Sequence, residues 1–399
     1  MKQLLSKIAV VGGAGHVGAP LALVLAQAGF PVLIHDINRQ SMDKMANGKM
    51  PFYEKGGERL LREMLRRGRL EFSDQPMSIR AAQTVILTVG TPIDEFHNPV
   101  TSLLTRCLDS LIPHLRVGAL LILRSTVAPG TTLFLKRHIQ QKRPDLLLAF
   151  CPERVVQGQA IEEIQSLPQI ISGTSPEAVR RAEKLFRNIA KKTVKMNPRE
   201  AEYAKLICNA YRYIQFAATN QLYMMVQSAG LDYHRLLDGM KEGYPRMAGI
   251  PRAGFAAGPC LMKDTMQLFA FEKHNFALGQ VAMTINEGLP DYLVSRLTQN
   301  RSLAGQKVGI LGMAFKAESD DIRDSLSFKL RKILRFAGAQ VLCADPYIND
   351  KSLVHPREIL QRCRIVILGV PHRAYQKLKI PSRITVVDPW GFFRNSAGA

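Results

Sequence analysis

Cys260, Lys263 and Asp264 lie close together at the expected start of a helix, within residues 258–265. A cysteine just before a helix gains thiolate character from the helix N-terminus and from a neighbouring cation, and the thiolate is the nucleophilic form. Free cysteines are also among the residues most often buried, so an inert Cys260 beside a solvated Lys-Asp pair is the alternative. The spacing indicates covalent catalysis but does not decide between the two interpretations.

A glycine-rich turn near the amino terminus indicates dinucleotide binding. The apolar run 7–11 leads into the turn, and a helix-like segment, 19–28, and a second strand, 32–36, follow it. The three glycines of the turn are Gly13, Gly15 and Gly18. In such a βαβ unit the first makes the tight turn, the second lets the pyrophosphate approach the backbone, and the third lets the helix pack on the strand.

Asp36 ends the second strand, where a carboxylate can accept hydrogen bonds from the ribose diol of an adenosine. Its negative charge would repel a 2′-phosphate, so NAD is favoured over NADP. Arg39 lies nearby and would suit a 2′-phosphate, so NADP stays open as the alternative.

Strand and helix signals alternate along the first part of the chain, as a parallel sheet requires. Apolar runs at 84–89, 119–124 and 146–150 predict further buried strands, and each ends in a polar loop. The loops contain Gly90-Thr91-Pro92, Ser125-Thr126-Val127 and Cys151-Pro152-Glu153-Arg154. Because the carboxyl ends of parallel strands meet at one edge, these loops should converge on one crevice.

A helix without Gly or Pro is predicted over 199–229, with Glu202, Lys205 and Asn209 on one face. Apolar residues lie nearly all round it, which predicts a buried helix. They include Leu206, Ile207, Tyr211, Ile214 and Phe216. A buried lysine needs a partner, so we expect Glu202, Asn209 or an oxyanion formed in the reaction to match the charge of Lys205.

A second Rossmann-like unit is predicted from about residue 303. The run 307–312 resembles residues 7–12, and strands are expected at 340–345, 364–369 and 384–388, but the full glycine fingerprint is missing. The charged loop at 313–325 would suit a nucleotide diphosphate; an ordinary polar loop is the alternative.

Length and composition fit a multidomain enzyme. A chain of 399 residues predicts two or three domains, and no apolar run approaches the ~20 residues of a membrane span. Residues 1–6 lack the apolar segment of a signal peptide, so a cytoplasmic location is expected. The six cysteines are scattered without a CxxC or Cys/His pattern, which predicts reduced thiols and no metal site. They are Cys107, Cys151, Cys208, Cys260, Cys343 and Cys363.

The net charge of +21 raises the alternative of a nucleic-acid-binding regulator. The basic residues are spread over amphipathic helices such as 58–69 and 177–192 rather than gathered into a stripe with aromatics. We therefore expect a solvated surface that also attracts anionic substrates, and no nucleic-acid partner.

Taken in order, these motifs resemble the nucleotide-sugar 6-dehydrogenases, which oxidise a UDP-sugar twice to its uronate. The resemblance runs from Lys7 to Gly391. It rests on Gly13-x-Gly15-x-Val17-Gly18, Ser125-Thr126-Val127 with Pro129-Gly130-Thr131-Thr132, Pro152-Glu153-Arg154, Lys205 with Asn209, Cys260-x-x-Lys263-Asp264, and Ala314-Phe315-Lys316 with Asp321-x-Arg323.

The resemblance implies an α/β fold with two Rossmann-like parallel-sheet domains joined by a central helical domain. The expected domains are an NAD-binding domain at 1–197, a helical dimerisation and catalytic domain at 198–302, and a UDP-sugar-binding domain at 303–399. It further implies a homodimer formed through the central helix, NAD as cofactor and a UDP-sugar as substrate.

The chemistry implied is a C6 aldehyde captured by Cys260 as a thiohemiacetal, which is oxidised to a thioester and hydrolysed. Lys205 and Asn209 would stabilise the oxyanions, Asp264 would activate the thiol or the water, and Glu153 with Thr126 would position a water that takes the proton. Expected cofactor contacts are Gly13, Gly15, His16, Val17, Gly18, Asp36, Arg39, Thr88, Thr91, Thr126, Lys263 and Arg323. Expected substrate contacts are Glu153, Arg154, Lys205, Asn209, Arg246 from across the dimer, Gly258, Phe315 and Lys316.

Two departures from the family pattern stand out. Ala256-Ala257 replaces a usual double glycine, and Pro99-Val100 replaces a usual acidic residue. Pro152-Glu153-Arg154 and Tyr244-Pro245-Arg246 favour a UDP-N-acetylhexosamine, either UDP-N-acetylmannosamine or UDP-N-acetylglucosamine. Lys263-Asp264-Thr265 is closer to the UDP-glucose enzymes, so UDP-glucose is the alternative. A single-hydride 3-hydroxyacid or 6-phosphogluconate-type dehydrogenase, which needs no thiol, is the more distant one.

Overall fold

The computed structural model describes residues 6–95, 99–273, 275–299 and 301–393. Residues 1–5, on which the expectation about a signal peptide rests, lie outside the described residues. Two compact units make up the chain, Met1–Cys208 and Asn209–Ala399. Helix α8 (Pro198–Ser228) begins in the first unit and ends in the second.

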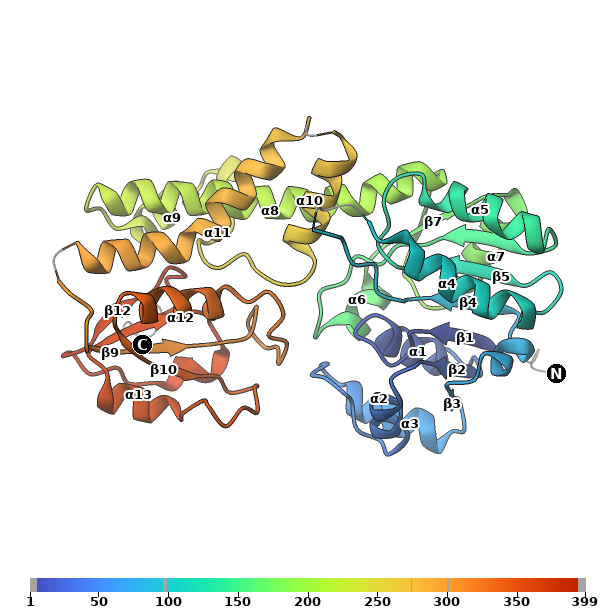
Figure 1. Cartoon of the computed structure of the whole chain (residues 1–399), viewed down its shortest axis with the longest axis horizontal. Helices are drawn as coiled ribbons and strands as arrows, with labels where there is room; N and C mark the ends of the chain where they lie inside the picture. The colour runs from blue at the N-terminus through green and yellow to red at the C-terminus, as the bar shows by residue number, and fades with distance from the viewer. Residues whose placement is uncertain (1–5, 96–98, 274, 300, 394–399) are drawn as a thin grey trace. The chain divides into compact units, whose positions relative to one another are not determined.

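The first unit holds an eight-stranded sheet with the order β3-β2-β1-β4-β5-β6-β7-β8 (Figure 1). Its strands are β1 (Ile8–Val11), β2 (Val32–His35), β3 (Leu70–Ser73), β4 (Thr84–Leu87), β5 (Leu120–Leu123), β6 (Leu147–Phe150), β7 (Gln169–Gly173) and β8 (Thr193–Lys195). Neighbours are parallel except β6 and β7, which pair antiparallel. The chain returns from β3 to β4 on the other side of β1, so the loops after β1 and β4 meet at the switch point, where ligands bind in such sheets.

Helices cover both faces of this sheet, which explains why its central strands β1, β5 and β6 are wholly apolar and β4 has Thr84 as its one polar residue. Alternate residues of β1 enter different cores: Ile8 and Val10 pack in one, and Ala9 and Val11 in the other. The helices are α1 (Gly18–Gln27), α2 (Arg39–Ala46), α3 (Gly57–Arg66), α4 (Thr101–Leu111), α5 (Thr131–Lys142), α6 (Ala160–Ser166), α7 (Pro176–Phe186) and the start of α8, with short 3-10 turns at Pro76–Ala81 and Ile112–His114.

The second unit holds a four-stranded parallel sheet with the order β10-β9-β11-β12. Its strands are β9 (Lys307–Leu311), β10 (Gln340–Ala344), β11 (Ile365–Leu368) and β12 (Thr385–Val387). Helices α12 (Leu326–Phe336) and α13 (Pro356–Arg362) lie on its opposite faces (Figure 1). The other helices of this unit are the end of α8, α9 (Tyr233–Lys241), α10 (Leu261–Phe271) and α11 (Ala277–Thr298), with 3-10 turns at Pro245–Met247 and Arg373–Lys377.

The two sheets share a turn after their first strand. The amide of Gly12 donates to the carbonyl of His35 over 2.9 Å, and the amide of Gly312 donates to that of Ala344 over 2.8 Å. Asp345 Oδ2 accepts from the next amide, Met313, at 2.7 Å. The prediction of two Rossmann-like units is therefore confirmed.

Helix α8 matches its predicted range, but the expectation that it is buried all round is wrong. Leu206 is fully buried, whereas Ile207 is 50% exposed and Tyr211 is 61% exposed. The apolar pattern shows what a helix can bury, and here the described part of the chain covers only the face that carries Leu206. Within the described residues, no helix is both long enough and apolar enough to cross a bilayer.

Candidate active site

The glycine-rich turn after β1 is shaped by close backbone approaches. A Cβ on Gly13 would lie 2.6 Å from the carbonyl oxygen of Val10, and one on Gly18 would lie 2.2 Å from that of Gly12. Gly18 opens α1, and the closest atoms to a Cβ on it belong to the turn, Gly12 and Gly13, and to Thr88. A Cβ on Gly15 would meet nothing closer than 3.4 Å, which leaves the space that an approaching pyrophosphate needs. The N-terminus of α1, next to Val17, adds backbone donors for an anion.

Asp36 supports this turn from the end of β2. Its Oδ2 accepts from the amide of Ala14 and its Oδ1 from the amide of Asn38, both at 2.9 Å. Carboxylate oxygens accept more than one hydrogen bond, so Asp36 keeps capacity for a diol. Arg39 pairs with Asp74, which offsets the charge that would suit NADP. The residues present thus fit a dinucleotide with a free ribose diol.

The loops after β4 and β5 are bonded to the first turn and to each other. Thr88 Oγ1 donates to the carbonyl of Val11 over 2.8 Å, and Thr91 Oγ1 donates to that of Thr126 over 2.5 Å. The expected cofactor residues of three loops therefore lie at one sheet edge. His16 belongs to the same region: its ring lies 4.0 Å from that of Phe52.

Glu153 and Lys205 form a buried ion pair in the first unit. Lys205 Nζ lies 3.0 Å from Glu153 Oε1, and the two side chains are 5% and 12% exposed. Burial alone would raise the pKa of Glu153, but the charges of Lys205 and Arg124 and hydrogen bonds from Lys205 and the Val155 amide hold it below its usual range. The carboxylate is therefore ionised although buried.

Glu202, which was expected among the partners of Lys205, instead caps the start of α5. Its Oε2 accepts from the amide of Gly130 at 2.6 Å, and its Oε1 accepts from the amide and hydroxyl of Thr132 at 2.7 and 2.6 Å. A carboxylate at a helix N-terminus is stabilised by the amides there. Arg154, expected to bind substrate, donates to the carbonyl of Pro168 over 2.5 Å.

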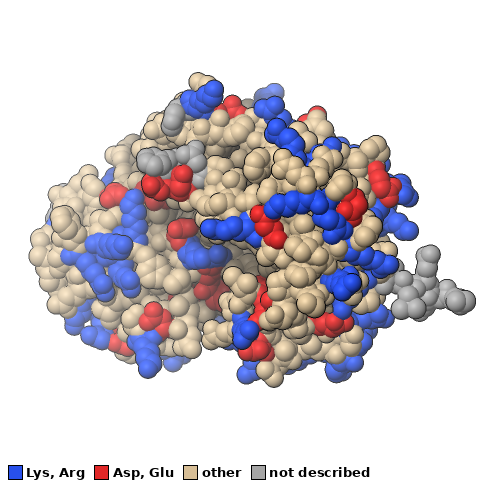
Figure 2. Space-filling view, turned by 45° about the vertical axis from the view of Figure 1, so that its right-hand side comes forward, with Lys and Arg blue, Asp and Glu red and all other residues tan. Residues whose placement is uncertain are grey.

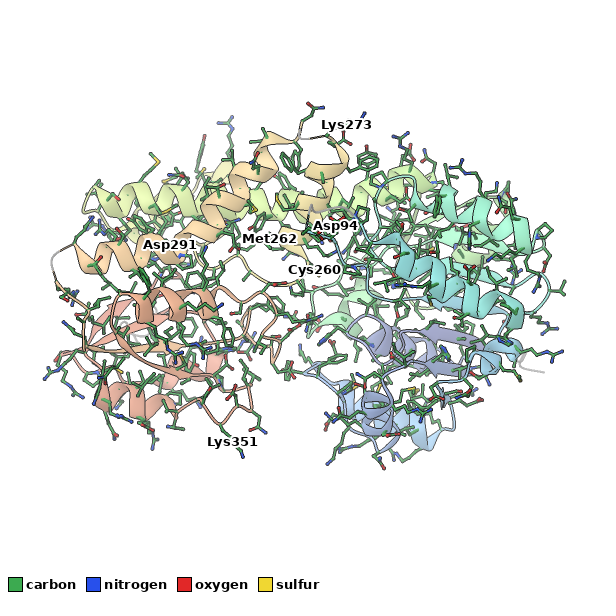
Figure 3. The ribbon with its side chains drawn as sticks, viewed as in Figure 1. Asp94, Cys260, Met262, Lys273, Asp291 and Lys351 are labelled. Atoms are coloured by element: carbon green, nitrogen blue, oxygen red, sulfur yellow. The ribbon has the colours of Figure 1, made fainter. Side chains whose placement is uncertain are left out.

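Cys260, labelled in Figure 3, is the residue directly before α10. Its side chain is exposed. The burial of Cys260 that the alternative interpretation expected is therefore excluded. Arg323 lies near it: the pKa of this guanidinium is raised above its ordinary value first by hydrogen bonds to Asp321 and also by the charge of Cys260. A helix N-terminus and a cation both favour a thiolate at this position.

Asp264 is buried one turn into the same helix. Its Oδ2 accepts from Asn209 Nδ2 at 2.6 Å, and Lys263 Nζ lies 2.7 Å from its Oδ1. The carboxylate thus fixes the orientation of the Asn209 amide beside the helix that carries Cys260.

The loop after β9 packs against the approach to Cys260. Gly258 has φ +102°, and a Cβ on it would lie 2.4 Å from the ring of Phe315, so only glycine fits. The amide of Gly258 donates to the carbonyl of Asp324 over 3.3 Å. Ala256, at the departure from the double glycine, packs its methyl group in a small core with Tyr213. The expected substrate residues Gly258 and Phe315 are therefore in contact.

The comparisons with known proteins agree with this geometry. Residues 6–190, 199–288 and 309–394 match the NAD binding, central and UDP binding domains of the UDP-glucose/GDP-mannose dehydrogenase family. A UDP-N-acetyl-D-mannosamine dehydrogenase of Pyrococcus horikoshii is 30% identical over 386 residues, which cover 93% of this chain and 91% of the relative. The chain belongs to the UDP-glucose/GDP-mannose dehydrogenase family.

The fold of this chain is also similar to solved structures of UDP-sugar dehydrogenases. A UDP-glucose dehydrogenase of Pyrobaculum islandicum has a TM-score of 0.88 and 25% identity, covering 98% of this chain and 96% of the other. The structure of a UDP-D-ManNAc dehydrogenase from Pyrococcus horikoshii has a TM-score of 0.89 and 26% identity, covering 97% and 99%. This chain is therefore an NAD-dependent UDP-sugar dehydrogenase, and the alternatives of a nucleic-acid-binding regulator and a 3-hydroxyacid dehydrogenase are set aside.

Figure 2 shows Lys and Arg side chains spread over one face, with Asp and Glu among them. The described residues hold no group of three or more His, Cys, Asp or Glu that could bind a metal ion.

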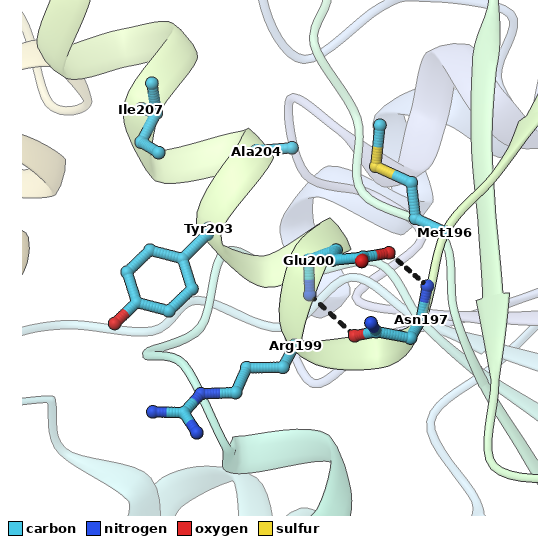
Figure 4. A pocket seen from close by; sticks show the side chains of 7 residues that line it. All are labelled: Met196, Asn197, Arg199, Glu200, Tyr203, Ala204 and Ile207. Atoms are coloured by element: carbon cyan, nitrogen blue, oxygen red, sulfur yellow. Dashed lines mark hydrogen bonds between the residues drawn. The ribbon is translucent and has the colours of Figure 1, made fainter.

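A hollow of about 510 Å³ lies at the start of α8, and none of the expected site residues lines it (Figure 4). It is lined by Met196, Asn197, Arg199, Glu200, Tyr203, Ala204 and Ile207. The half-exposed Ile207 belongs to it, so this hollow adjoins the apolar face of α8 that the described residues leave open.

Proposed function

We propose that the chain oxidises the C6 hydroxyl of a UDP-sugar twice, to the uronate, through a thiohemiacetal and a thioester on Cys260. The observation that carries the proposal is an exposed thiol directly before α10, near Arg323 and followed by the buried pair of Asp264 and Asn209. An alcohol-to-aldehyde oxidation alone would need no such nucleophile.

Glu153 is the group suited to the proton of the alcohol. Its ionised carboxylate, with Thr126, would hold the water that takes this proton. NAD, when bound, accepts a hydride from C6 in each oxidation. The Cys260 sulfur then bonds to the aldehyde carbon, and the aldehyde oxygen becomes the hydroxyl of a thiohemiacetal.

Lys205 and Asn209 lie one turn apart on α8, so both can serve one oxyanion. Asn209 gives one N–H to Asp264 and has a second to offer. Water then attacks the thioester carbon, the carbon–sulfur bond breaks, and the uronate leaves while Cys260 regains its proton. Asp264 would assist the thiol or this water.

The cofactor is proposed to lie along the turn of Gly13 to Gly18 with its ribose on Asp36. We expect Asp36→Ala to weaken NAD binding by ~1.5–3 kcal/mol, because a charged acceptor is lost, and to lessen discrimination against NADP. Calorimetric titration with both cofactors measures this. Since Asp36 also accepts from the Ala14 amide, Asp36→Asn, which keeps one acceptor oxygen, is the matched variant. Unchanged NAD affinity in Asp36→Ala would show that the ribose is held elsewhere.

A UDP-N-acetylhexosamine is the substrate we propose. Pro152-Glu153-Arg154 and the relatives named UDP-N-acetyl-D-mannosamine dehydrogenase support it. The likeness to a UDP-glucose dehydrogenase structure supports the alternative. Purified enzyme with NAD and UDP-N-acetylmannosamine, UDP-N-acetylglucosamine or UDP-glucose decides by kcat/KM and product mass. A preference for UDP-glucose would overturn the substrate assignment, and no uronate from any of the three would overturn the function.

A homodimer is proposed on the exposed apolar face of α8. Ile207, Tyr211 and Met225 are half-exposed or more, and large apolar side chains gathered on one face indicate an interface. We also propose that the chain has three domains, at 1–197, 198–302 and 303–399, and that the dimer forms through the middle one. Sedimentation of the full chain should give the mass of two copies, and a monomer at micromolar concentration would contradict it.

A further inference from the structure

Arg124 is a buried arginine that the proposed chemistry does not use directly. It follows β5 and is 2% exposed. Its Nη1 donates to the carbonyl of Cys151 over 3.2 Å and to Oε1 of Gln169 over 2.9 Å, and the guanidinium lies 5.3 Å from the centroid of the Phe186 ring. Burial lowers the pKa of Arg124, because removing the charge from water is costly. Apolar packing therefore does not explain an arginine here.

Gln169 connects Arg124 to a second backbone carbonyl. It opens β7, is 8% exposed, and donates from Nε2 to the carbonyl of Pro152 over 2.9 Å. Arg124 and Gln169 are bonded to each other, and together they hold the two successive carbonyls of Cys151 and Pro152. Glu153 is the next residue, so these bonds fix the backbone from which its carboxylate projects.

We propose that Arg124 and Gln169 form a clamp that positions Glu153 for the reaction. The inference rests on the proposed function, in which Glu153 holds the water that takes the alcohol proton. Arg124 is a positioning residue in this account, because it acts through Glu153 rather than on the substrate.

Two cations, Lys205 and Arg124, act on the charge of Glu153, and Cys151 lies two residues before it in the sequence. Lys205 comes from α8, Arg124 follows β5, and Cys151 follows β6. The charges of both Lys205 and Arg124 lower the pKa of Glu153 against the effect of burial. Burial raises the pKa of Cys151 to about 12, so its thiol stays neutral. Without Arg124, Glu153 keeps only one of these two cations and should take up a proton at higher pH.

The pH profile of kcat separates this role from a structural one. We expect the acid limb of the profile to move up by about one pH unit in Arg124→Met, since an opposite charge nearby shifts a carboxyl by roughly that amount or more. Activity should fall at low pH, where Glu153 is protonated, and recover as the pH rises. Arg124→Lys keeps the charge and should keep the acid limb near its wild-type position.

Two further variants isolate the clamp. Gln169→Met keeps the charge of Arg124 but frees the Pro152 carbonyl, so kcat should fall roughly 10- to 100-fold without a shift of the limb, as expected for a misplaced group. Arg143→Met is the control, because Arg143 by itself donates to two backbone carbonyls, those of Ile112 and Leu115, as Arg124 and Gln169 do together. It should lower the melting temperature and leave the pH profile unchanged.

The outcomes distinguish this inference from the proposed function. If the wild-type chain makes no uronate, the proposed function fails first. If the wild type turns over and folded Arg124→Met keeps both its kcat and its acid limb, the clamp is wrong and the proposed function stands. If Arg124→Met does not fold, the decision passes to Gln169→Met, and wild-type kcat in that folded variant overturns the proposal.

Discussion

Cys260→Ser should abolish uronate formation, lowering turnover by at least roughly three orders of magnitude, as loss of a nucleophile does in other covalent enzymes. A serine hydroxyl at this place is a far weaker nucleophile than a thiolate beside a helix N-terminus. NAD binding should be unchanged, because Cys260 is not among the expected cofactor contacts. The measurement is the rate of uronate formation by mass, with cofactor affinity measured alongside.

Cys107→Ser is the matched control. Burial raises the pKa of the Cys107 thiol to about 11, so it stays neutral and unreactive near pH 7. This variant should keep its turnover. Full activity in Cys260→Ala would contradict the covalent mechanism outright. An enzyme-bound adduct of Cys260→Ser that no longer hydrolyses would be its most direct support.

Lys205→Met should cut kcat by about two to three orders of magnitude with little change in KM, since stabilising an oxyanion is worth roughly 3–4 kcal/mol. Methionine keeps the stem of the side chain and removes its charge. The structure adds a second effect: Glu153, paired with Lys205 at 3.0 Å, loses its partner and is left partly buried. Steady-state kinetics with both substrates varied measures kcat and KM separately and shows which of the two changes.

The double variant Lys205→Met with Glu153→Gln separates these effects. Removing both charges relieves the unpaired carboxylate, so the melting temperature should return toward that of the wild type. Turnover should stay low, because the double variant has no Lys205 charge to stabilise the oxyanion and no Glu153 carboxylate to hold the water that takes the proton. Lys205→Met with wild-type turnover and only a lower melting temperature would reduce Lys205 to a structural partner of Glu153.

Much of the framework could be predicted from local pattern. The apolar runs that became β1, β4 and β5 are short and continuous because both faces of the sheet are covered. The position of Cys260 directly before α10 also follows from neighbouring residues alone. The antiparallel strand β7 was missed because its pairing with β6 is a long-range choice that no local period encodes.

The partners of buried charges could not be predicted for the same reason. Lys205 and Glu153 lie 52 residues apart in the sequence, and Glu202 lies 70 from Thr132. The spacing of Glu202, Lys205 and Asn209 predicted that they share one face of α8, but not which residues that face contacts. Arg124 left one local signal, an arginine at the end of an apolar strand, which becomes informative only once its burial and its bond to Gln169 are known.

The ratio of NADH formed to UDP-sugar consumed tests the central claim most directly. With UDP-N-acetylmannosamine or the preferred sugar limiting and NAD in excess, the absorbance of NADH and the mass of the product are followed to completion. Two oxidations, the second of them on the Cys260 adduct, predict two NADH per sugar and a uronate as the final product. One NADH per sugar, with the aldehyde released, would contradict the account.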